Sequence, residues 1–103
     1  MIHSPARAQA VERFRPDPRR LYDLAWAARL AGVSRHSVLV YCRWGLVRPV
    51  ANPEEHGWYF NSEAIATVRH VEYLRVHEGV NLAGIRLILR LLEEFGHKFP
   101  SRW

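Results

Sequence analysis

The sequence predicts a mainly α-helical domain, a winged helix-turn-helix of four helices with a small β-hairpin wing. Three observations lead to this prediction. Apolar residues recur at helical spacing in four segments, a glycine turn joins the first two, and two short apolar runs follow them. The 103 residues, 49% of them hydrophobic, can bury one modest core. We expect one domain over residues 21–95, a flexible, basic, proline-containing arm over 1–20 and a short tail over 96–103.

The first two helices form the predicted helix-turn-helix. Asp23 can accept a hydrogen bond from the amides that open a helix, and Gly32 suits the left-handed position that closes it. Ser34 can cap the second helix, whose inward stripe is predicted to be Val38, Tyr41 and Cys42. An ordinary helical hairpin is the alternative interpretation, which the combination of caps, turn and stripe disfavours.

A small β-hairpin, the wing, is expected next. Two apolar runs, 46–50 and 57–60, flank a polar segment, as the strands of a hairpin flank its loop. Arg48 would suit a contact from this wing to a nucleic-acid backbone. The rings of Trp58 and Tyr59 are expected to pack on the helices, to stack against a partner, or to do both.

Two further helices follow the wing. One is predicted over 62–77, and the other from Leu82 to about Phe95. Polar residues placed before them can act as caps: Asn61 or Ser62 for the first, and Asn81 for the second. The first is expected to expose Arg69, Glu72 and Arg75.

The last helix carries more apolar surface than one core face requires, because Leu87 and Leu91 extend its stripe around the cylinder. A second copy of the chain or another protein is expected to cover this side, and the N-terminal arm is the alternative cover.

Positive charge is concentrated in the first half of the chain. Residues 1–50 carry nine arginines and three acidic residues, a net charge of +6, whereas residues 51–103 have a net charge of −1. No carboxylate side chain occurs between Leu24 and Ala51. This distribution favours a polyanion as the partner, although a general bias towards arginine would also contribute to it.

Several classes of protein are disfavoured. A lone cysteine, Cys42, excludes an internal disulfide framework, and no apolar run has the length that crosses a bilayer. The N-terminus does not resemble a secretory signal, so a cytoplasmic location is expected. The six histidines are scattered, with no strong metal-ligand spacing, glycine-rich phosphate loop or catalytic grouping. We therefore expect no enzymatic activity, metal or cofactor.

The chain resembles the N-terminal winged helix-turn-helix domain of the MerR superfamily over nearly all of residues 21–95. Four segments carry the resemblance: Y-D-L-A-W-A-A-R-L-A-G-V-S, V-Y-C-R-W-G-L-V-R-P, S-E-A-I, and E-G-V-N-L-A-G-I-R-L-I-L. The run from Gly79 to Ile85 is particularly similar to two branches. These are the HspR-type heat-shock repressors, which bind DNA, and the CbpM-type chaperone modulators, which bind the J-domain of a DnaJ-like co-chaperone.

The two branches imply different sites. For a DNA-binding MerR-type transcriptional regulator of heat-shock or chaperone genes, the second helix would enter the major groove of double-stranded DNA. Its expected contacts are Arg35, His36 and Arg43, with Arg48 on the wing. For a chaperone modulator, the expected partner surface is instead Leu39, Val40, Trp58 and Tyr59.

The residues leave both branches open. DNA-binding members usually carry an arginine where this chain has Leu39 and another near Tyr59 or Phe60, which favours the modulator. The basic first half favours the DNA-binding regulator, since J-domains commonly present a basic helix themselves. Regulators of this superfamily generally dimerise through a long C-terminal helix, which the residues after Phe95 are too short to form. A DNA-binding regulator would therefore have to use the fourth helix for dimer contacts or act with another subunit. We prefer the DNA-binding regulator.

Overall fold

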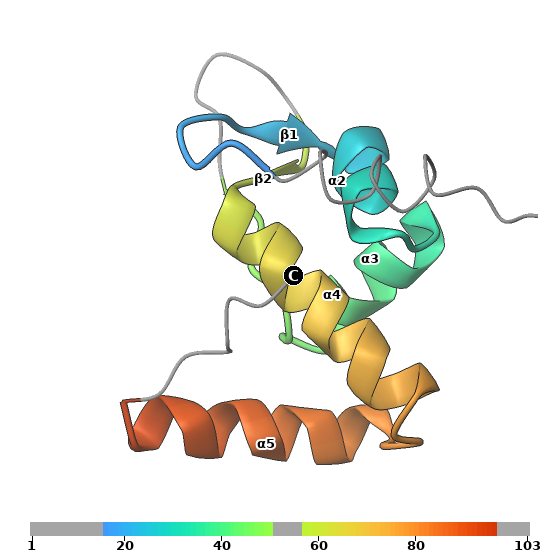
Figure 1. Cartoon of the computed structure of the whole chain (residues 1–103), viewed down its shortest axis with the longest axis vertical. Coiled ribbons are helices and arrows are strands. Elements are labelled where there is room, and N and C mark those ends of the chain that lie inside the picture. The colour runs from blue at the N-terminus through green and yellow to red at the C-terminus, as the bar shows by residue number, and fades with distance from the viewer. Residues whose placement is uncertain (1–15, 51–56, 97–103) are drawn as a thin grey trace, which may run out of the picture.

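The structure is a computed structural model that describes residues 16–50 and 57–96. This part of the chain contains four helices and two short strands (Figure 1). In chain order the elements are β1 (Tyr22–Asp23), α2 (Leu24–Ala31), α3 (Arg35–Arg43), β2 (Tyr59–Phe60), α4 (Ser62–Val76) and α5 (Leu82–Glu94). The mainly α-helical fold with four helices is confirmed. Most of the predicted arm and nearly all of the predicted tail fall outside the described residues, so these two boundaries remain predictions.

Each helix begins where its capping residue predicts. The side chain before each helix accepts a hydrogen bond from the amide three positions further on, at 2.8–3.0 Å; these caps are Asp23, Ser34, Asn61 and Asn81. Gly32 has a φ of +74°, the left-handed conformation that closes α2 and turns the chain into α3. The predicted helix-turn-helix is present.

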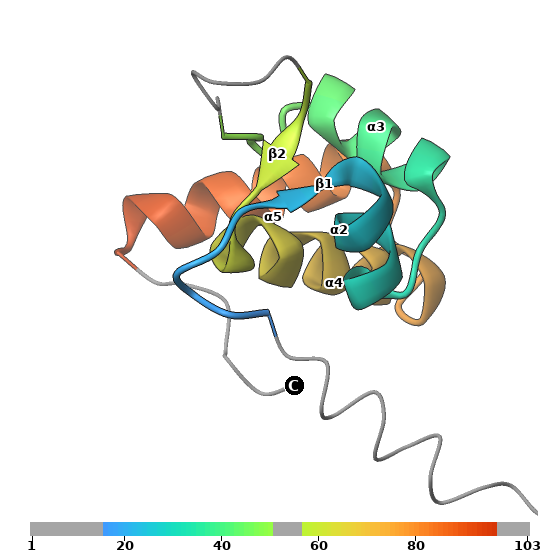
Figure 2. The same ribbon diagram turned by 90° about the horizontal axis from the view of Figure 1, so that it is seen from above.

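The strands β1 and β2 pair in antiparallel register, Tyr22 with Phe60 and Asp23 with Tyr59 (Figure 2). Tyr59 also forms an isolated bridge with Val50, so the two predicted arms of the wing meet at this point, and the tip of the wing lies outside the described residues. The wing was predicted from the sequence, but its pairing with β1 was not. Two extended residues directly before a helix carry no alternating pattern that would reveal a strand.

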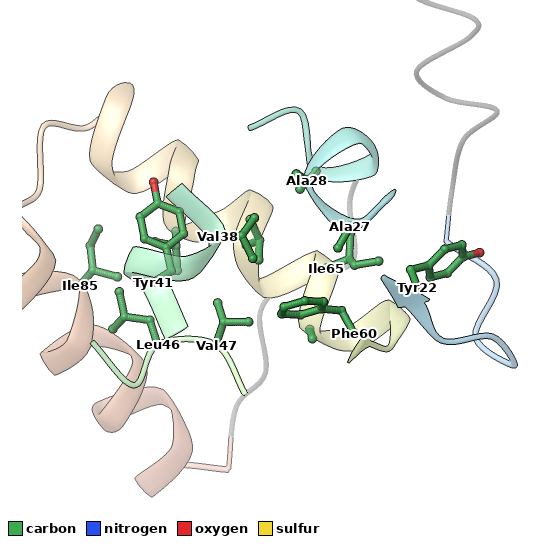
Figure 3. Close-up of a cluster of buried hydrophobic side chains, with 14 residues drawn as sticks. Tyr22, Ala27, Ala28, Val38, Tyr41, Leu46, Val47, Phe60, Ile65 and Ile85 are labelled. Carbon is green, nitrogen blue, oxygen red and sulfur yellow. The ribbon is translucent and has the colours of Figure 1, made fainter. Parts of the chain in front are cut away.

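The hydrophobic core joins the four helices and the sheet of the described residues (Figure 3). Its largest fully buried side chains are Tyr41, Phe60, Ile65, Ile85, Val38, Val68 and Val71. The central helix is α4, which contacts α2, α3, β2 and α5. Cys42, which was predicted to point inward, packs against the edge of this core and is only partly buried.

The last helix, α5, lies at the end of the molecule opposite the sheet and crosses the end of α4 (Figure 1). Ile85 is its only fully buried residue, whereas Leu87 is 55% exposed and Leu91 43% exposed. The expectation that this helix carries uncovered apolar surface therefore holds for the described residues. Among the same residues, no helix has the length and apolar character needed to span a membrane.

Candidate nucleic-acid interface

The four residues predicted to contact DNA are all exposed. Arg35 and His36 lie in the first turn of α3, Arg43 ends the helix, and Arg48 follows it. Positions 36, 39 and 43 share one face of a helix, which places Leu39 between His36 and Arg43. Residues 24–50, all of which the structure describes, carry no carboxylate side chain. The outer face of α3 is therefore positively charged with one partly exposed apolar residue in its middle.

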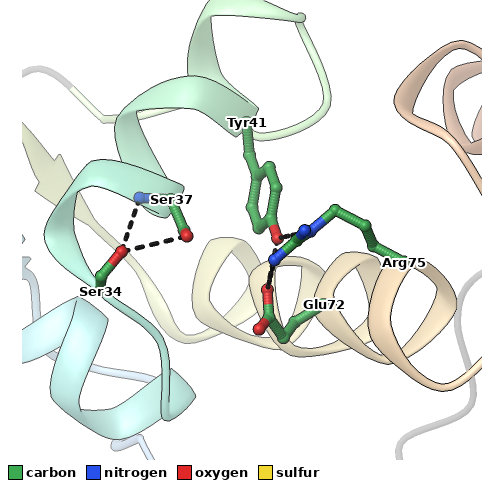
Figure 4. Close-up of polar contacts among 5 residues, drawn as sticks. All are labelled: Ser34, Ser37, Tyr41, Glu72 and Arg75. Carbon is green, nitrogen blue, oxygen red and sulfur yellow. Dashed lines mark hydrogen bonds and ion pairs between the residues drawn. The ribbon is translucent and has the colours of Figure 1, made fainter.

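The inner face of α3 is held against α4 by three polar groups (Figure 4). The hydroxyl of Tyr41 donates a hydrogen bond to Oε1 of Glu72 and accepts one from Nε of Arg75 at 2.8 Å. Arg75 also forms an ion pair with Glu72 at 3.3 Å. Burial and the hydrogen bond to Glu72 raise the pKa of Tyr41, so the ring stays neutral and keeps its hydroxyl proton.

Of the three side chains expected on the exposed side of α4, Arg75 is exposed, whereas Arg69 and Glu72 are partly buried. Glu72 and Arg75 also reach the hydroxyl of Tyr41, which was not expected. Helical spacing within α4 places the two side chains on one face but does not show that α3 brings a tyrosine to that face. The polar groups thus bridge two helices that the sequence analysis treated separately.

The end of α3 also contacts α5. Trp44 is the C-terminal cap residue of α3, and its ring is 37% exposed. The guanidinium carbon of Arg86, from α5, lies 5.4 Å from the ring centroid, within the range of a cation–π interaction. Contacts from both α4 and α5 therefore fix the orientation of α3 relative to the rest of the domain.

A shallow hollow lies beside the first turn of α3. It is lined by residues from α2 and from the turn that follows: Ala25, Trp26, Ala28, Arg29, Val33, Ser34 and Arg35. Trp26 is 47% exposed, and the guanidinium carbon of Arg29 lies 5.4 Å from its ring centroid. Arg29 contributes to the net charge of the first half of the chain, but neither residue was predicted as a site. Trp26 and Arg29 lie three positions apart on one helix, and this spacing is the sequence feature that could have predicted their contact.

The residues predicted as an alternative protein-binding surface have different environments. Trp58 is 46% exposed, whereas Tyr59 pairs within the small sheet. Leu39 and Val40 were expected to be exposed, but both are partly buried, and Val40 packs against the core. The physical reason is that α3 packs against both α2 and α4, so more of its circumference is covered than one inward stripe predicts.

Two comparisons of the chain with known proteins found a match. Residues 22–92 match the family model described as MerR HTH family regulatory protein. A Streptomyces coelicolor protein named as a heat shock protein, HspR, is 35% identical over 71 residues, which are 69% of this chain and 46% of that protein. The chain thus spans about half the length of this curated relative. No solved structure matches the chain.

Proposed function

Since the chain belongs to the MerR HTH family of regulatory proteins, we propose that it binds double-stranded DNA and regulates transcription of heat-shock or chaperone genes. The observation that carries this proposal is the exposed basic face of α3, flanked by Arg48, in a stretch that lacks carboxylates. The similarity to a protein named as a heat shock protein supports the link to chaperone control. A regulator of this kind acts by binding, so we infer no catalysis and a cytoplasmic location.

In the proposed complex, α3 enters the major groove. Arg35 and Arg43 are separated by about 12 Å along the helix axis at a rise of 1.5 Å per residue, so they can contact the DNA at separate positions, Arg43 at a base edge and Arg35 at the backbone beside the groove. A guanidinium can donate two parallel hydrogen bonds to N7 and O6 of guanine. His36 is a supporting contact, Leu39 can touch a thymine methyl group, and Arg48 neutralises a phosphate beside the wing.

A second copy of the chain is the proposed cover of α5. Leu87, Leu91 and Phe95 recur every fourth residue and are 55%, 43% and 72% exposed. The same helix carries Arg86 and Arg90 before Glu93 and Glu94. If two copies of α5 pair in antiparallel orientation about a twofold axis, the basic part of one helix lies against the acidic end of the other. Parallel pairing would instead place like charges next to each other. One winged module reads a half-site, so a dimer would read two.

A second candidate function rests on Trp58, whose ring is 46% exposed at the wing. An exposed tryptophan on the wing and a partly exposed Leu39 on α3 suit a protein partner, for which a J-domain of a DnaJ-like co-chaperone is the candidate. The two functions differ in their ligand and can be measured on one preparation.

The deciding experiment is a mobility shift on the DNA upstream of the chain's own gene, run beside a binding assay with the organism's J-domains. We expect a salt-dependent DNA complex that Arg43→Ala weakens. DNA affinity that is independent of salt and of Arg43 would overturn the proposal, and saturable J-domain binding lost in Trp58→Ala would establish the second function instead.

A further inference from the structure

We propose that the hollow between α2 and the first turn of α3 binds a phosphodiester of the DNA backbone. The binding residues are Arg29 and Arg35, with Trp26 as the platform that positions Arg29. The inference rests on the proposed function and adds to it a sequence-independent contact from the first helix of the pair.

The first argument is the convergence of charge. Arg29 lies in the last turn of α2, and Arg35 is the first residue of α3, yet both line the same hollow. No carboxylate lines this hollow among the described residues, and the ion pair described elsewhere in that part of the chain uses neither arginine. Two guanidinium groups on one concave surface repel each other unless an anion lies between them. A phosphate group matches their forked donors.

The second argument is the placement of Trp26. Its ring is 47% exposed, so core packing accounts for only part of its surface. The guanidinium carbon of Arg29 lies 5.4 Å from the ring centroid, a contact that restricts the side chain before any ligand binds. The loss of conformational entropy on binding is then smaller than for a freely rotating arginine.

The third argument is the position of the hollow relative to α3. Arg35 belongs both to the hollow and to the exposed basic face of α3. When α3 lies in the major groove, the first helix of a helix-turn-helix crosses the adjacent sugar-phosphate backbone. The hollow therefore faces a phosphate and not a base edge. Its contact should strengthen binding to every DNA sequence by the same factor.

The test measures the affinity of the full chain for two duplexes of equal length, one from its own upstream region and one unrelated, between about 50 and about 200 mM salt. We expect Arg29→Ala to lower the affinity for both duplexes by the same factor, roughly five-fold at the lower salt concentration. The slope of log affinity against log salt should fall by about 0.9, the value for one lost phosphate contact.

Three further variants separate charge from position. Arg29→Lys should keep the salt slope, since it keeps the charge, and lose part of the affinity, since it lacks the planar fork. Trp26→Ala should lower affinity roughly two- to five-fold, the effect of removing a cation–π contact, and leave the slope near that of the wild type. Arg19→Ala removes the same charge from an exposed residue that does not line the hollow, and it should leave the slope unchanged.

The outcomes distinguish this inference from the proposed function. If the unmodified chain binds neither duplex, the proposed function fails. If it binds both and Arg29→Ala has the same slope as Arg19→Ala, the proposed function stands and the phosphate contact is overturned. Inorganic phosphate added at constant ionic strength should not displace the duplex. Displacement that depends on Arg29 would assign the hollow to free phosphate and overturn the DNA contact.

Discussion

Arg75 donates a hydrogen bond from Nε to the hydroxyl oxygen of Tyr41 at 2.8 Å, and this contact joins α4 to the inner face of α3. The same hydroxyl donates to Glu72, so one phenol group satisfies both partners. Because the opposite face of α3 carries the proposed DNA contacts, the Tyr41 contacts determine the direction in which those residues point.

Tyr41→Phe should destabilise the domain by about 1–2 kcal/mol, because it removes two hydrogen bonds and leaves the ring in place. For a domain of this size, the corresponding fall in melting temperature is roughly 4–16 °C. Thermal unfolding followed by circular dichroism checks the prediction. The matched control is Tyr73→Phe. Because Tyr73 is 52% exposed, this substitution should hardly change the stability of the domain. Equal effects of the two substitutions would mean that the Tyr41 contacts contribute nothing.

Arg43→Ala should weaken binding to the upstream DNA by about 1–3 kcal/mol and should affect an unrelated duplex less, because a lost base contact reduces discrimination. Arg48→Ala should weaken both duplexes alike and lower the salt slope by about 1. Fluorescence anisotropy on both duplexes measures these effects. If Arg43→Ala weakened both equally, Arg43 would contact the backbone and not a base.

Leu87→Glu should dissociate the proposed dimer, since it places a charge in an apolar interface. Sedimentation of the unmodified chain and the variant measures the change in mass. The matched control is Val76→Glu on α4, because Val76 and Leu87 are both 55% exposed. If the unmodified chain is monomeric at all concentrations, or if both variants sediment alike, α5 is not the dimer surface.

Cys42 should make the stability of the domain depend on pH in alkaline solution. Burial raises the pKa of its thiol to about 11, above the value of about 8.5 in an unfolded chain. The folded state therefore favours the protonated thiol. The resulting contribution to the free energy of unfolding is complete below the pKa of the thiol in the unfolded chain, and it is lost as pH rises towards 11.

Urea unfolding of the unmodified chain and of Cys42→Ala checks this dependence. The stability of the variant relative to the unmodified chain should increase as pH rises from about 8.5 to 11. In the folded chain at pH 8, alkylation by iodoacetamide should be slow, since the thiolate is the reactive form. A constant difference in stability over this range would contradict the assigned cause.

Particular residues show which features could be predicted from the sequence. The boundaries of α2 and α3 followed from Asp23, Gly32 and Ser34, because a cap acts on amides within its own turn. In α4, Ile65, Val68 and Val71 recur at helical spacing in the sequence and are buried in the structure. Helical spacing likewise placed Arg35, His36 and Arg43, the predicted DNA contacts of α3, on its exposed face. Their roles in DNA binding are proposals.

Other features were not predictable, since they join residues far apart in the chain. Tyr22 and Phe60 pair across 38 positions, and Tyr41 meets Glu72 across 31. The exposure expected for Val40 was wrong, because a single helix does not show how many neighbours will cover it. The hollow also escaped prediction, since it exists only where α2 and the start of α3 meet at an angle.

The sequence by itself determined the four helices, the turn between α2 and α3, and the positive charge of this half of the chain. All of these depend on residues within a few positions of one another, where backbone geometry sets the spacing. Only the tertiary structure decided that β1 pairs with β2, that Glu72 and Arg75 hold Tyr41, and that Trp26, Arg29 and Arg35 share one hollow. These contacts depend on how complete helices pack, because packing of the whole core places distant segments side by side.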